Sequence, residues 1–176
     1  MKTSIKLFAL GMILMGFGVN ANAQVTETTD AKARILTVLT IAETQYLEFG
    51  SMGVLAGTGG TCVVTTGGVR SATSGVTLST MGATASAAAF HVTGEPTYTY
   101  AIQLPSTITI TRVGSTETMT VGNLLAKSTL GTDSHTATGV LTSGADNFTV
   151  GGTLAVAAGQ KEGAYAGTFD VTVVYN

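Results

Sequence analysis

Short segments in which β-branched residues alternate with polar ones recur along the chain, and they constrain its fold more than any other feature. Residues 24–176 contain 32 threonines and 16 valines, which crowd an α-helix and suit the pleated surface of a strand. Residues 83–89 and 122–127 offer at most one helical turn each, so we expect an all-β fold. The expected strands are residues 35–41, 61–65, 75–79, 88–93, 98–104, 108–110, 119–121, 135–141, 148–156 and 168–175.

The spacing of these segments indicates an antiparallel β-sandwich or barrel of about nine or ten short strands. The length of 176 residues suits a single domain that buries its own core. Turn-forming Gly, Ser, Asn and Asp residues separate the strands, and neither a domain boundary nor an internal repeat is evident after residue 35.

Charge and residue inventory exclude several classes of function. A formal net charge of −2 provides no electrostatic footprint for nucleic acid. Neighbouring side chains diverge along an extended chain, so Asp133, Ser134 and His135 cannot form a hydrolase triad. We expect no enzymatic activity, no cofactor and no metal site. Cys62 is the single cysteine and cannot form a disulfide within the chain, so we interpret it as a small residue packed in a strand.

The N-terminal residues predict export from the cytoplasm. Lys2 and Lys6 precede a short apolar run at residues 7–19, which is shorter than the roughly 20 residues that span a bilayer. Ala21 and Ala23 flank Asn22 in the pattern that a signal peptidase cleaves. We therefore expect a signal peptide at residues 1–23.

The last segment of the chain carries a one-sided apolar pattern. Phe169, Val171, Val173 and Tyr175 are apolar, and most of the residues between them are polar, which is typical of a strand with one buried face. Gly163 is the 14th residue when Asn176 is counted as the first, and Tyr175 is the penultimate residue.

This ending resembles that of the subunits of bacterial chaperone–usher pili. The resemblance implies an incomplete immunoglobulin-like sandwich in which the last strand borders an open groove, with Gly163, Phe169, Val171, Val173 and Tyr175 at the acceptor edge. A periplasmic chaperone fills that groove first, and the N-terminal extension of the next subunit then replaces it. The physical reason is that an unpaired apolar strand edge promotes aggregation unless it is covered.

A wider resemblance covers residues 35–176. The chain is similar to the bacterial domain-of-unknown-function family 4402, which in turn is similar to Mat-type fimbrial subunits and spore-coat U-type proteins. The matching segments, in chain order, are residues 35–41, 47–50, 89–94, 139–141, 150–154 and 163–169. Many subunits of this kind have a disulfide near the first strand, and this chain cannot form one.

Residues 24–34 form the N-terminal extension that this resemblance requires as a donor strand. Ala31, Ala33 and Ile35 alternate with charged residues, as a donated strand should. Val25 continues this phase, whereas Glu27 breaks it. The short side chains bury little apolar area, so the joint would depend more on backbone hydrogen bonds.

These features predict an exported structural subunit that passes through the periplasm to the cell surface and polymerises into a fimbria-like filament by donor-strand exchange. Its expected partners are further copies of itself, a periplasmic chaperone and an outer-membrane usher. The alternative is a monomeric secreted sandwich that binds glycan or a host surface as an adhesin. In that alternative the sandwich is closed, and its last strand is already paired within the chain.

Overall fold

The computed structural model describes residues 24–176, and the candidate signal peptide at residues 1–23 lies outside the described residues. The chain divides into two units at the junction of Arg34 and Ile35, and each is described by itself. Residues 24–34 carry exposed side chains and contain no strand. Residues 35–176 form an all-β sandwich. Among the described residues there is no helix with the length and apolar character needed to cross a membrane.

Thirteen strands form within residues 35–176, and every strand pair is antiparallel. In chain order they are β1 (Thr40–Gln45), β2 (Met52–Val54), β3 (Gly60–Val64), β4 (Arg70–Ala72), β5 (Val76–Leu78), β6 (Ala88–Thr93), β7 (Thr99–Gln103), β8 (Thr107–Arg112), β9 (Thr118–Ser128), β10 (Thr138–Val140), β11 (Ala145–Val156), β12 (Tyr165–Ala166) and β13 (Thr172–Tyr175).

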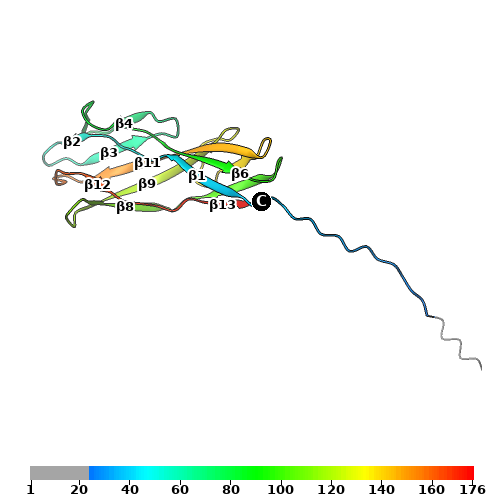
Figure 1. Cartoon of the computed structure of the whole chain (residues 1–176). Coiled ribbons are helices and arrows are strands. Elements are labelled where there is room, and N and C mark those ends of the chain that lie inside the picture. The colour runs from blue at the N-terminus through cyan, green and yellow to red at the C-terminus, as the bar shows by residue number, and fades with distance from the viewer. Residues whose placement is uncertain (1–23) are drawn as a thin grey trace, which may run out of the picture. The chain divides into compact units, whose positions relative to one another are not determined.

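The largest sheet has the order β1-β6-β11-β9-β8-β12, and β3 joins it by pairing with β11 and β4 (Figure 1). A second sheet has the order β10-β7-β13, and β2 pairs with β5 in a third. The twelve-residue strand β11 organises the largest sheet. Since β9 occupies one edge of β11, strands β6 and β3 share the other edge, with β6 along its first half and β3 along its second.

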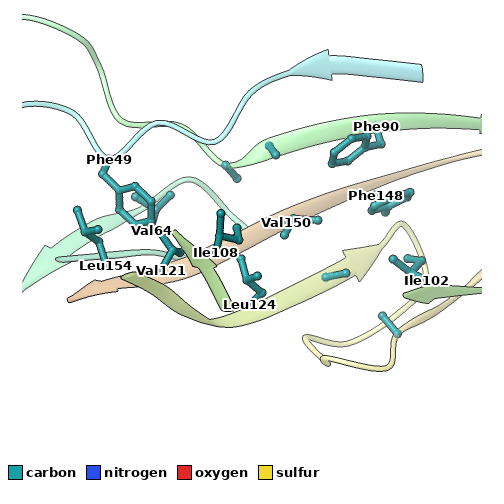
Figure 2. Close-up of a cluster of buried hydrophobic side chains, with 14 of the residues drawn as sticks. Phe49, Val64, Phe90, Ile102, Ile108, Val121, Leu124, Phe148, Val150 and Leu154 are labelled. Atoms are coloured by element: carbon teal, nitrogen blue, oxygen red, sulfur yellow. The ribbon is translucent and has the colours of Figure 1, made fainter. Parts of the chain in front are cut away.

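The core lies between the largest sheet and β7, and its side chains follow the alternation of the strands (Figure 2). Phe90 points inward from β6 and stacks on Phe148 of β11, with ring centroids 5.0 Å apart. Tyr100 of β7 is fully buried, and its hydroxyl donates a hydrogen bond of 3.0 Å to Oδ2 of Asp146. Burial and the neighbouring carboxylate together raise the pKa of Tyr100 well above its usual range.

The predicted all-β sandwich is confirmed, but three local predictions are wrong. The first strand begins at Thr40 rather than at residue 35, because the backbone N–H of Thr37 bonds to the Glu95 side chain instead of to a neighbouring strand. Residues 122–127 lie within β9, where pairing with β11 overrides any helical turn. The strand expected at residues 168–175 forms only over Thr172–Tyr175 (β13), and the short β12 that precedes it pairs in a different sheet.

Replacing Tyr100 by Phe should lower the free energy of unfolding by about 1–3 kcal/mol, because the buried Asp146 carboxylate loses a donor. Urea unfolding measures this loss. Tyr46→Phe is the matched control: Tyr46 is 64% exposed, and its change should stay within about 0.5 kcal/mol. A Tyr100→Phe protein as stable as the parent would contradict the role assigned to this pair.

Candidate binding groove

An open groove of about 1000 Å³ with an apolar floor lies between two stretches of chain that are far apart in the sequence. One wall, the β2 wall, comprises residues 46–54, and the other, the β12 wall, comprises residues 160–167. Phe169 extends the lining beyond the β12 wall. The floor consists of apolar side chains from β8, β9 and β11: Ile108, Ile110, Met119, Val121, Leu154 and Val156.

Both walls contain a strand that pairs on one edge only. Within the described part of the chain, β2 pairs with β5 alone and β12 pairs with β8 alone. The β2 wall is further fixed on its β5 side, where Ser79 donates its N–H to the carbonyl of Ser51 at 3.0 Å. A strand that pairs on one edge has backbone groups available on the other, so the groove offers both apolar contact and hydrogen bonding.

The structure separates the predicted acceptor residues into two sets. Gly163 and Phe169 line the groove, whereas Val171, Val173 and Tyr175 lie beyond it and pack partly buried against the core. Val173 and Tyr175 belong to β13, which pairs with β7 on one edge and is the last strand of its sheet. The acceptor edge predicted from the sequence is therefore discontinuous, because the chain crosses from one sheet to the other between β12 and β13.

Gly163 occupies a backbone conformation that favours glycine. Its φ of +137° is one that other residues rarely adopt, and an added Cβ would lie 2.7 Å from Nε of Arg112. Arg112 is held at 3.6 Å from the Glu117 carboxylate. Gly163 thus allows the chain to pass close to β8 just before β12 begins.

The candidate donor residues are exposed. Ala31 and Ala33 lie in the first unit and outside any strand, and Ile35, at the start of the second unit, is 97% exposed. The polar side chains that alternate with them, including Lys32 and Arg34, are also exposed. Substitutions at Ala31 and Ala33 therefore perturb no packed core.

Tyr175 fastens the start of the sandwich domain to its end. Its hydroxyl donates to the carbonyl of Thr37 at 2.8 Å and accepts the backbone N–H of Glu95 at 2.6 Å. Both the backbone N–H and Oγ1 of Thr37 donate to Oε2 of Glu95 at 3.0 Å. The Tyr175 ring packs edge-on against Tyr98, with centroids 5.9 Å apart. We call these contacts the Tyr175 clamp; it fixes the point from which the N-terminal extension leaves the domain.

Sequence reasoning did not identify the β2 wall or the partly buried floor residues Ile110 and Met119. Residues 47–50 stand out only as part of the family resemblance, and the alternation of Ile108 with Ile110 signals a strand rather than a groove floor. The residues of the apparent triad have separate structural partners: Asp133 accepts a hydrogen bond from Thr66, and His135 Nδ1 lies 3.0 Å from the carbonyl oxygen of Leu124.

Two comparisons bear on the relationships of the chain. Residues 39–175 match the sequence model of a family described as Domain of unknown function (DUF4402). A comparison with curated proteins gives no match. The matched residues run from just before β1 to the end of β13, so they include both walls of the groove and the Tyr175 clamp residues Glu95 and Tyr175.

Replacing Tyr175 by Phe retains the ring packing but removes both hydrogen bonds of the hydroxyl. The free energy of unfolding should fall by about 0.5–1.5 kcal/mol, and the Glu95 amide, which loses its acceptor, should exchange its hydrogen faster. Hydrogen exchange followed by NMR measures this. Tyr165→Phe is the control, because that hydroxyl bonds to Lys161 and Gln160 and should leave Glu95 unchanged.

Proposed function

This chain belongs to the DUF4402 family, and we propose that it is an exported structural subunit of a fimbria-like surface filament assembled by donor-strand exchange. One observation carries the proposal: a groove with an apolar floor is lined by two strands that each pair on one edge only. The proposed occupant is the N-terminal extension of a second copy. A periplasmic chaperone would cover the groove before assembly, and an outer-membrane usher would be the site of exchange.

The order of the strands supports an immunoglobulin-like arrangement. In immunoglobulin sandwiches the first, second, fifth and fourth strands form one sheet, and the third, sixth and seventh form the other. Here β1, β6, β11 and β9 are consecutive in one sheet, and β7 and β13 are neighbours in the other.

The chemistry of the groove favours an extended apolar segment as its occupant. A strand placed between β2 and β12 would give hydrogen-bonding partners to both one-sided strands, and its inward side chains would contact the floor. Ile110 and Met119 are only partly buried, so the floor presents apolar surface that such side chains would cover. Covering it would contribute about 25 cal/mol per Å² of apolar area.

The extension has the alternation that this occupant requires. Ala31, Ala33 and Ile35 would face the floor, while Lys32 and Arg34 would face solvent. The candidate signal peptide at residues 1–23 supports export to the periplasm and then to the cell surface. Because the inward side chains of Ala31 and Ala33 are small, the backbone hydrogen bonds of the joint would contribute most of its affinity.

A comparison of two substitutions, one on the inward-facing side of the extension and one on its solvent-facing side, tests this joint. Ala33→Asp should abolish filaments, because it places a charge against the apolar floor, whereas Thr28→Asp lies in the solvent-facing phase and should leave them intact. Both positions are exposed, so neither change should unfold the domain. Size-exclusion chromatography with light scattering and electron microscopy of shear-released material measure assembly.

A second experiment mixes two variants, one with a defective extension and one with a defective groove. Met119→Asp should disable the groove while leaving the extension intact, and Lys127→Asp on the outer face of β9 is its control. Mixing the Ala33→Asp and Met119→Asp proteins should give dimers that grow no further, since the mixture can make one kind of joint. Unchanged filaments from either variant alone, or a parent chain that stays monomeric, would refute the proposal.

A further inference from the structure

The β2 wall bends at Gly50, and the side chain of Arg70 fixes the bend. Arg70 reaches from β4, and its Nη1 donates to the carbonyls of Phe49 at 2.9 Å and Ser51 at 3.1 Å. Its Nη2 donates to the carbonyl of Ser79 at 2.6 Å. A single guanidinium thus joins the wall on both sides of the bend to β4 and to the chain that follows β5.

The backbone at Gly50 is fitted to this guanidinium. Its φ of +68° lies in the left-handed region, and an added Cβ would collide with Nη1 of Arg70 and lie 3.0 Å from the carbonyl oxygen of Ala83. Glycine therefore permits both the turn and the close approach. Phe49, the residue before the bend, points into the core and is 8% exposed.

An empty groove of this kind has a competing arrangement. Its apolar floor and its two unpaired strand edges would both be covered if the β2 wall moved across and paired with the β12 wall. Neighbouring strands lie about 4.8 Å apart, so a groove that admits a strand holds its walls about two spacings apart, whereas a closed one holds them one spacing apart. Some interaction must oppose this closure.

We propose that Arg70 is the positioning residue that holds the groove open, by fastening the β2 wall to β4 on the side away from the β12 wall. The assignment rests on the proposed function, in which the groove must remain able to receive a strand. Arginine suits the task because its planar guanidinium donates to several carbonyls at fixed angles, whereas a lysine ammonium cannot reproduce that geometry.

The separation of the walls is the most direct readout. Spin labels attached at Gly53→Cys and Ala166→Cys would report it by pulsed electron paramagnetic resonance, since both positions are exposed and line the groove. Cys62 is fully buried and should remain unlabelled. The labels are placed in a chain that also has Ala33→Asp, so that the extension of a second copy does not occupy the groove.

Arg70→Met should shorten the distance between the labels by about 5 Å, one strand spacing. Arg70→Lys should give label distances that are intermediate or divided between the open and closed values. If the Arg70→Met protein does not fold, the Arg70→Lys distances test the role of Arg70. Lys127→Met, which removes an exposed positive charge from β9, should leave the distance unchanged. Unchanged distances in both Arg70 variants would overturn the proposal.

A synthetic peptide of residues 24–36 provides a functional readout on the same proteins. Arg70→Met should weaken its binding at least tenfold, and Lys127→Met should not change it. If the peptide fails to bind the parent groove, the proposed function fails, while the label distances still decide the role of Arg70. If Arg70→Met binds the peptide as tightly as the parent, with the label distance unchanged, the role of Arg70 is refuted and the proposed function stands.

Discussion

A groove whose two walls each contain a half-paired strand, above an apolar floor, is the constraint on which the rest of this molecule depends. Water can satisfy the free backbone edges, but it cannot stabilise the apolar floor. A second chain in extended conformation satisfies both at once, because its backbone pairs with the edges while alternate side chains cover the floor. This combination favours a protein ligand with strand geometry over a compact small molecule.

The remainder of the sandwich provides the rigidity that such a groove needs. Strand β11 pairs with three other strands, and its inward residues Phe148, Val150 and Leu154 are almost fully buried. Leu154 is both a core residue and part of the groove floor, so the floor is continuous with the core. The Tyr175 clamp fixes the exit of the extension, and Arg70 fixes the β2 wall. The groove is thus bounded by fixed elements.

Strand alternation predicted the parts of the fold that local pattern determines. Residues 88–93 were expected as a strand and form β6, with Ala88, Phe90 and Val92 inward. The groove was less predictable, since the β2 wall depends on partners that are distant in sequence. Arg70 lies 21 residues from Phe49, and no local pattern near Gly50 predicts their contact. Strand β12 was not predicted for the same reason, since its partner β8 is distant in sequence. The apolar alternation of residues 169–175 does not reveal that only Thr172–Tyr175 pairs as a strand.

A cryo-electron microscopy reconstruction of the assembled material would show directly where the N-terminal extension of each copy lies. We expect residues 24–36 of one copy to lie as a strand between the β2 and β12 walls of the next, with Ala31 and Ala33 toward Ile110 and Met119. A reconstruction in which that groove is vacant, or is filled by the extension of the same copy, would contradict it.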